Sequence, residues 1–307
     1  MAAVAADQVP TVPLPGGVVL MDGGMGQELR RRGLTDGPPG LWSANALLRS
    51  PETVLEVHRA YIRAGARIIT TNTYSTKRPR LEAAGIGDRL EALNRLAGEL
   101  ACRARDELDE NVLIAGSLPP LYGSYRPDLV RPIDETLPLY REQAEILAPY
   151  VDLYLCETMS SAAEARAAAS GAASTGKPVW VAWTLDEEGA GRLRSGESVT
   201  EAAAAVADLP VSGLLVNCCP PESISAAMPE LAALGPWPCG GYANGFAVVP
   251  AGWGSADGIA ALGTRPDLGP DAYARHVQSW IAAGARLVGG CCEIGPGHIA
   301  RLREVLG

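Results

Sequence analysis

Apolar residues recur along the chain in short runs, each followed by a polar or glycine-containing stop and then by a stretch rich in Ala, Leu, Glu and Arg. Short, nearly continuous apolar runs are typical of strands that are buried on both faces of a parallel sheet. The longer stretches between them have a helical pattern. The pattern predicts strands that begin at Val18, Ala66, Asn111, Asp152, Pro178, Ser212, Pro238 and Ala285.

Helix-boundary signals separate these predicted strands. In the stretch SPETVLEVHRAYIRAG, Ser50 stands at the expected N-cap, Thr53 lies in the first turn, and Gly65 closes the helix. The segment IRAGARII before the second strand recurs as IAAGARLV before the eighth, which indicates one helix-to-strand turn used twice. Eight strand–helix units in a chain of 307 residues predict a (β/α)8 TIM barrel of the α/β class. An open doubly wound sheet is the alternative.

Two segments do not follow the repeat. No change of composition marks a domain boundary, so we expect one domain over residues 1–307, with residues 1–16 as a flexible N-terminal extension. The segment from Gly245 to Pro270 is rich in Gly, Pro and Ala and follows the seventh strand. We expect a long surface loop over the barrel mouth, with a mobile lid as the sharper alternative.

Charge and cysteine content exclude several classes of protein. The net charge of -9, without a cluster of Lys and Arg, argues against nucleic-acid binding. The sequence shows neither a signal-peptide pattern nor the run of about eighteen apolar residues that a membrane span needs, so we expect a cytoplasmic protein. Seven cysteines in such a chain favour thiol or metal chemistry over disulfides. Homo-oligomerisation stays open.

Polar residues collect where the predicted strands end. Parallel barrels build their active sites at the C-terminal ends of the strands, so these side chains should share one mouth. They comprise two carboxylates, several amides and hydroxyls, and thiols. The residues are Asp22, Asn72, Thr73, Ser117, Glu157, Thr184, Asn217, Cys218, Asn244, Cys291 and Cys292.

The thiols among them suggest a metal site. Neighbouring residues on a regular strand point to opposite faces, so Cys291 and Cys292 can converge only where the strand has ended, and Gly289 and Gly290 leave room for the backbone to bend there. With Cys218 they would provide three thiolates, the ligand type and number of a catalytic zinc site with an open fourth position. The alternatives are burial as small apolar residues and a redox-active dithiol.

Other candidates have simpler interpretations. Cys102, Cys156 and Cys239 stand alone and are read as buried apolar residues. His58 and His276 fall within predicted helices, where packing or solvation explains them. Taken singly, Asp22 could be a turn or N-cap residue and Glu157 a carboxylate at a helix N-terminus.

Five motifs taken together resemble the homocysteine S-methyltransferase family over nearly the whole chain. The motifs are LMDGGMGQELRRRG, ARIITTNTYST, DLYLCETM, GLLVNCCPPE and LVGGCCEIGPGHI. The resemblance implies a (β/α) barrel that binds zinc through three cysteines and methylates homocysteine to methionine. One segment, SLPPLYGSYRPD after the third strand, departs from the shorter form expected in the family.

The resemblance also implies roles for individual residues. Cys218, Cys291 and Cys292 would be the zinc ligands, and Cys219 a neighbour without that role. Asp22 and Glu157 would hold the ammonium group of the amino acid. The remaining substrate-binding positions are Gly23, Thr73 and Asn217 in the same pocket, and Trp42 on the donor side.

These roles predict a zinc-dependent enzyme that moves a methyl group from a small cationic donor to the homocysteine thiolate. A site of three thiolates favours a cationic donor, and an aromatic face such as Trp42 or Tyr242 attracts one. S-methylmethionine or S-adenosylmethionine is favoured over betaine. Two alternatives stay open. The chain could activate homocysteine for a separate corrinoid methyl carrier, or it could be a zinc- or thiol-sensing barrel without turnover.

Overall fold

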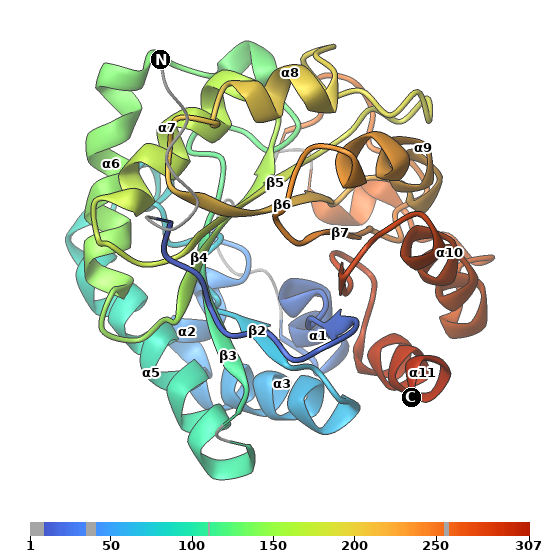
Figure 1. The fold of residues 1–307 in the computed structure, drawn as a ribbon. Helices are drawn as coiled ribbons and strands as arrows, with labels where there is room; N and C mark the ends of the chain where they lie inside the picture. Colours follow the sequence, from blue (N-terminus) through green and yellow to red (C-terminus); the bar gives the residue numbers. More distant parts are fainter. Residues whose placement is uncertain (1–8, 35–40, 110, 255–257) are drawn as a thin grey trace.

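Eight parallel strands form a ring in the computed structural model, which describes residues 9–34, 41–109, 111–254 and 258–307 (Figure 1). The strand order runs β1-β8-β7-β6-β5-β4-β3-β2, and a parallel bridge between Met21 and Ile68 joins β1 to β2. The predicted single-domain TIM barrel is therefore confirmed, and the open-sheet alternative is wrong. The strands are β1 Val19–Leu20, β2 Ile68–Thr70, β3 Leu113–Leu118, β4 Leu153–Met159, β5 Val179–Trp183, β6 Val211–Asn217, β7 Cys239–Tyr242 and β8 Leu287–Val288.

Helices surround the ring and bury their apolar faces against its outer side. In α3, Ser50 is the N-cap as expected, but its hydroxyl bonds the Thr53 hydroxyl at 2.8 Å instead of a backbone N–H. Gly65 ends α3 in the left-handed conformation that favours glycine. The helices are α1 Met25–Arg31, α2 Ala44–Arg49, α3 Pro51–Ala64, α4 Arg78–Ala83, α5 Leu90–Leu108, α6 Ile133–Leu147, α7 Ala162–Ala173, α8 Val199–Ala204, α9 Pro221–Ala232, α10 Pro270–Ala282 and α11 Pro296–Leu306.

The interior of the ring is a packed apolar core. Trp180, Leu155 and Leu215 belong to it, and all three are almost completely buried. Burial of such side chains stabilises the fold by about 1.5–3 kcal/mol each. The core leaves the C-terminal ends of the strands free for polar residues.

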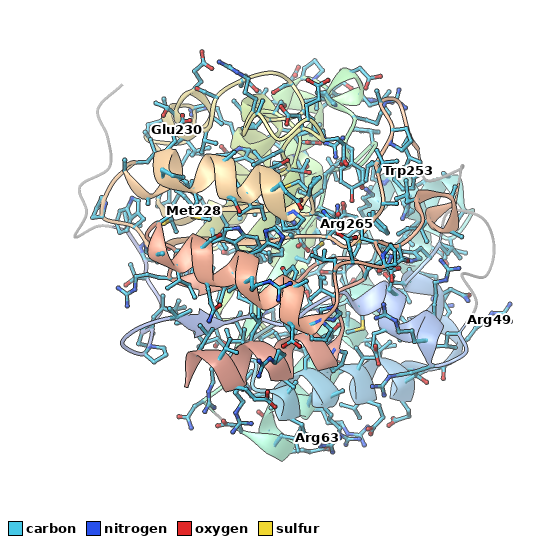
Figure 2. The ribbon with its side chains drawn as sticks, turned by 90° about the vertical axis from the view of Figure 1, so that its right-hand side faces the viewer. Arg49, Arg63, Met228, Glu230, Trp253 and Arg265 are labelled. Carbon is cyan, nitrogen blue, oxygen red and sulfur yellow. The ribbon has the colours of Figure 1, made fainter. Side chains whose placement is uncertain are left out.

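The segment between β7 and α10 lies against the C-terminal mouth. Phe246, Val249 and Leu262 form one buried cluster with Cys218 and Cys292. A short 3-10 helix, Ile259–Leu262, and a bridge between Phe246 and Thr264 give the segment local order. Trp253 and Arg265 mark its course in Figure 2. The segment covers the mouth as expected, whereas lid motion stays a prediction.

The first described residues lie at the N-terminal side of the barrel, where Val12 and Leu14 line a cavity with Pro238 and Arg286. Of the predicted extension, residues 1–8 fall outside the described residues, while Val12 and Leu14 pack against the interior core. Among the described helices, none has both the length and the apolar composition needed to cross a membrane.

Candidate active site

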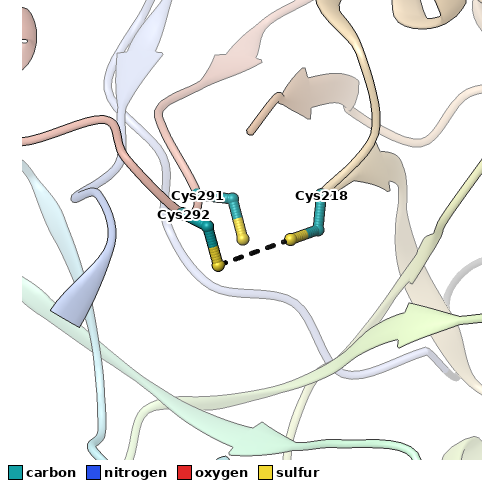
Figure 3. Close-up of side chains that lie close together, drawn as sticks. All are labelled: Cys218, Cys291 and Cys292. Carbon is teal, nitrogen blue, oxygen red and sulfur yellow. Dashed lines mark hydrogen bonds between the residues drawn. The ribbon is translucent and has the colours of Figure 1, made fainter. Parts of the chain in front are cut away.

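Three cysteine sulfurs meet at the mouth of the barrel (Figure 3). Cys218 follows β6, and Cys291 and Cys292 follow β8. The three Sγ atoms all lie within 4.8 Å of one another, and Cys218 Sγ is 3.8 Å from Cys292 Sγ. Within the described part of the chain, this is the one group of Cys, His, Asp and Glu ligand atoms close enough to hold a metal ion.

The backbone explains why adjacent cysteines can converge after β8. This strand is only two residues long, and the glycines that follow it pack tightly. A Cβ on Gly289 would lie 2.7 Å from Met21 Cβ, and one on Gly290 would lie 2.2 Å from Ile294 Cγ2. The Cys291 N–H donates to Ala243 O at 2.9 Å. Glycine is needed here for close approach, which lets the chain leave the strand direction at once.

Cys218 reaches the cluster by a different route. Its backbone has a φ of 49°, an unusual left-handed value for a residue other than glycine, and its N–H donates to Tyr242 O at 3.0 Å. Cys219, the next residue, is fully buried in the core between sheet and helices. Burial raises the pKa of the Cys219 thiol, which therefore stays protonated.

The electrostatics of the cluster fit a soft cation. Burial opposes ionisation of Cys218, but hydrogen bonds from Cys291, Cys292 and the Tyr125 hydroxyl outweigh it and lower the Cys218 pKa. The same contact with Cys218 raises the pKa values of Cys291 and Cys292. Cys218 is thus the sulfur that ionises most readily, and a bound cation would displace the protons of Cys291 and Cys292. Three sulfur ligands are the donor set of a catalytic zinc site.

Two buried carboxylates lie in the same cavity as the thiols. Asp22, just after β1, accepts hydrogen bonds from the Thr70 N–H at 2.7 Å and the Thr70 hydroxyl at 3.1 Å. Glu157, on β4, accepts from the hydroxyls of Ser117 and Tyr242. Burial raises the pKa of Asp22 to about 8 and that of Glu157 to about 7.

The simpler interpretations of these acids do not hold. The N-cap of α1 is Gly24 and that of α7 is Ser161, so neither carboxylate caps a helix. Neither forms an ion pair with a described Lys, Arg or His. A buried acid in a cavity without a cationic partner can bind a ligand that brings a positive charge.

Of the four other residues predicted to bind substrate, two line the cavity and two do not. Gly23 and Trp42 line the cavity, which has a volume of about 510 Å³. Thr73 does not line it, because its hydroxyl donates to Ser117 O at 2.8 Å. Asn217 does not line it either, and its side chain bonds the backbone and hydroxyl of Thr158 at 2.8 and 2.9 Å. Any role of Thr73 and Asn217 in binding is therefore indirect.

Sequence reasoning missed several residues around the thiols. The Tyr125 hydroxyl lies 3.0 Å from Cys218 Sγ, and Tyr125 packs edge-on against Trp253, with 5.8 Å between ring centroids. Tyr74 packs in the same way against Trp42, at 6.1 Å. Tyr125 comes from the segment SLPPLYGSYRPD, whose departure from the family pattern was the available signal. All four rings line the cavity.

The remaining cysteines and the histidines take no part in the cavity. Cys156 and Cys239 are buried, and Cys102 is partly buried. All seven cysteines are free, so the cluster is not a disulfide. His58 is fully buried, which lowers its pKa to about 4, and His276 lies 3.7 Å from Glu222.

A TIM barrel with three converging thiols and unpaired buried acids at its mouth has the residues that could hold a soft metal and a small cationic ligand. The family model for homocysteine S-methyltransferase matches residues 19–306. Homocysteine S-methyltransferase of Escherichia coli (strain K12) is 33% identical over 93% of this chain and 94% of its own. Selenocysteine Se-methyltransferase of Brassica oleracea var. italica is 29% identical over 95% of this chain and 89% of its own.

Solved structures agree. The metallated form of the Escherichia coli homocysteine methyltransferase MmuM superposes with a TM-score of 0.78 at 31% identity, over 94% of this chain and 96% of that one. The chain belongs to the homocysteine S-methyltransferase family, as its motifs predict. It is accordingly an enzyme of the methyltransferase class, and the interpretation as a sensor without turnover is wrong.

Proposed function

We propose that the protein transfers a methyl group from a small cationic donor to the thiolate of homocysteine and forms methionine, with Zn²⁺ held by Cys218, Cys291 and Cys292. The observation that carries the proposal is the arrangement of these sulfurs in one cavity with the unpaired carboxylates of Asp22 and Glu157. The thiols suit a soft metal that takes a fourth sulfur, and the acids suit an α-ammonium group.

The reaction needs a thiolate at neutral pH. A free alkyl thiol has a pKa of about 8.5, so only a few per cent is ionised, and the gap corresponds to about 2 kcal/mol. When bound, zinc would supply this ionisation, because a coordinated thiol is deprotonated. The protein must provide the rest of the rate enhancement by alignment, which can contribute several kcal/mol.

Alignment of the acceptor falls to Asp22 and Glu157. An ammonium group between the two carboxylates would hold the amino-acid end, so that the side-chain sulfur extends toward the cysteines. Hydrogen bonds from Thr70 fix Asp22, and those from Ser117 and Tyr242 fix Glu157. Both acids are thus held before substrate binds, which reduces the entropy lost on binding.

The methyl transfer requires no general base on the protein. The homocysteine thiolate attacks the methyl carbon, the new sulfur–carbon bond forms, and the old bond to the donor breaks with its electron pair left on the donor, which departs neutral. A cation suits a cavity with acids and thiols, and the rings of Trp42, Tyr74, Tyr125 and Trp253 offer faces for cation–π contact. S-methylmethionine or S-adenosylmethionine is favoured as donor over betaine.

A donor panel tests the proposal. Zinc-loaded protein is incubated with homocysteine and S-methylmethionine, S-adenosylmethionine or betaine, and methionine is quantified by mass spectrometry. We expect methionine with at least one sulfonium donor and none after chelation of the metal. If zinc-loaded protein forms no methionine from any of these donors alone, the proposal fails, and reconstitution with a corrinoid carrier tests the alternative.

The proposal includes two further points. We place the protein in the cytoplasm, because free thiols persist in a reducing compartment and all seven cysteines are free. Selenocysteine, named in the Brassica oleracea relative, is a second acceptor for the same assay, since a soft-metal position accepts selenium as well as sulfur.

A further inference from the structure

The cavity that holds the thiols also has a basic part, formed by Lys77 and Arg80. Both residues belong to the segment that follows β2 and begins α4. Lys77 is only 3% exposed, although lysine is almost never fully buried without a partner. Removing an ammonium group from water is costly unless an opposite charge or hydrogen bonds compensate for the lost hydration.

Neither cation has a carboxylate partner among the described residues. Lys77 Nζ donates to Pro120 O and lies 5.7 Å from the centre of the Tyr74 ring. Arg80 Nη1 donates to the Ser75 hydroxyl at 3.2 Å. Glu164 influences Lys77 electrostatically, but its own carboxylate accepts hydrogen bonds from the Ser160 N–H and hydroxyl, each at 2.8 Å.

A neighbour shows that the absence of pairing is specific to the cavity. Arg78, between Lys77 and Arg80, points elsewhere and pairs with Glu142 and Glu82. The segment therefore has carboxylates within reach of its solvent-facing arginine and none bonded to its two cavity-lining cations. In a chain with 35 acidic and 26 basic residues, a buried lysine and a half-buried arginine without carboxylate partners are unexpected unless a ligand supplies the missing negative charge.

A second, independent feature lies on the same cavity wall. The Gln27 side chain is 3% exposed, and neither its amide oxygen nor its amide nitrogen has a hydrogen-bond partner. A buried amide left unsatisfied costs about 1–3 kcal/mol. Gln27 thus has an amide donor and an amide acceptor beside the cavity, and neither has a partner among the described residues.

The basic and acidic residues of the cavity come from different segments, with Lys77 and Arg80 at the start of α4, Asp22 after β1 and Glu157 on β4. The electrostatic neighbours of Lys77 are Arg80 and Glu164. Asp22 instead interacts with Glu157, and Glu157 with Cys218. Two bound ligands would match this arrangement if one placed its ammonium group at the acids and the other placed its carboxylate at Lys77 and Arg80.

We infer that Lys77 and Arg80 form a subsite for the carboxylate of the methyl donor, with the Gln27 amide as an additional polar contact. The inference rests on the proposed function, and it defines the donor as a cation that carries a carboxylate. The acceptor already has its sulfur at the thiols and its ammonium at the acids. The donor must place its methyl group beside that sulfur, so its far end is the group left to meet the cations beyond β2.

Equilibrium binding without acceptor tests this subsite, because no turnover occurs. Calorimetry compares S-methylmethionine with its carboxamide, which keeps the sulfonium and the ammonium but lacks the negative charge. We expect the zinc-loaded protein to bind the carboxylate form about 10- to 100-fold more tightly. Lys77→Met and Arg80→Gln should each lose most of this preference and leave the KM for homocysteine unchanged.

Arg89→Gln is the matched control, since it removes the same charge from an exposed residue of the adjoining turn. It should change neither the preference for the carboxylate form nor the KM for homocysteine. Zinc content and melting temperature verify the fold of each variant. If Lys77→Met does not fold, Arg80→Gln and the two ligands still decide. Equal binding of both ligands by the unmodified protein, or a raised KM for homocysteine instead of weaker donor binding, overturns the inference. The proposed function is judged separately, by methionine formation in the unmodified protein.

Discussion

The two cysteine pairs look alike in sequence but have different roles in the structure. After β6, Cys218 takes a left-handed φ of 49° and enters the thiol cluster, while Cys219 packs into the core on the helix side. After β8, the alternation ends before the cysteines, and both Cys291 and Cys292 reach the cluster. Both pairs thus follow the end of their strand, but only the pair after Gly289 and Gly290 brings two sulfurs to the cluster.

Serine substitutions should separate the pairs most strongly. Cys218→Ser or Cys291→Ser removes a sulfur ligand, so we expect loss of bound zinc and a fall in activity beyond the roughly 100-fold seen for changes around metal ligands. Cys219→Ser should retain zinc and activity, with a loss of stability of about 1–3 kcal/mol for a buried hydroxyl. Elemental analysis and methionine formation measure these outcomes. Retained zinc in Cys291→Ser would contradict the assignment.

Removal of the tyrosine hydroxyl that contacts Cys218 is expected to have the next largest effect. Tyr125→Phe deletes the hydroxyl that lies 3.0 Å from Cys218 Sγ and keeps the ring that packs on Trp253. Loss of such a supporting hydrogen bond lowers metal affinity or activity by about 10- to 100-fold. Tyr122→Phe, in the same segment, serves as the control. Equal zinc affinity in the two variants would show that the contact is incidental.

The tight packing after β8 offers a third test. Gly290→Ala would place a Cβ 2.2 Å from Ile294 Cγ2, so the turn that carries both cysteines must shift. Such overpacking costs about 1–3 kcal/mol, and we expect weaker zinc binding together with a lower melting temperature. Gly297→Ala, where nothing lies within 4 Å, is the control. A variant with normal stability and normal zinc affinity would remove the packing explanation.

The smallest effect expected is a pH dependence that separates the acids from the thiols. Methionine, which lacks a thiol, should bind more tightly as pH rises from 6 to 8, because Asp22 and Glu157 ionise with pKa values of about 8 and 7 and only the ionised forms attract its ammonium. Each acid should contribute a gain of at most about tenfold per pH unit while it titrates. Inhibition constants measure it, and Asp22→Asn should flatten the profile. Tighter binding at pH 6 would contradict this assignment.

The same shifts have an opposite consequence for unliganded protein. In the fold these acids favour their neutral form, whereas in the unfolded chain they ionise near pH 4. Their contribution to stability is therefore complete below that pH and is lost as pH rises through about 7 and 8. Thermal unfolding between pH 5 and 8 should show the decline, and it should be reduced in Glu157→Gln.

The sequence was informative where one physical rule dominated. All eight strands were predictable because a parallel barrel buries both faces of each strand, and the three thiols followed because strand ends share one mouth. Tyr125 could not be placed, since its φ of 63° is a property of one loop and no periodicity specifies it. Thr73 and Asn217 illustrate the converse, because a strand-end position does not tell whether a side chain faces the cavity or a neighbouring backbone.

The division of the sulfurs between β6 and β8 also bears on how the protein is made. One thiol lies some seventy residues before the other two. During synthesis a nascent chain that has not yet reached its final strand presents Cys218 alone, which cannot retain a metal ion. A metal bound by the three thiols could therefore be retained only after β8 has been made and has joined the barrel beside β7 and β1.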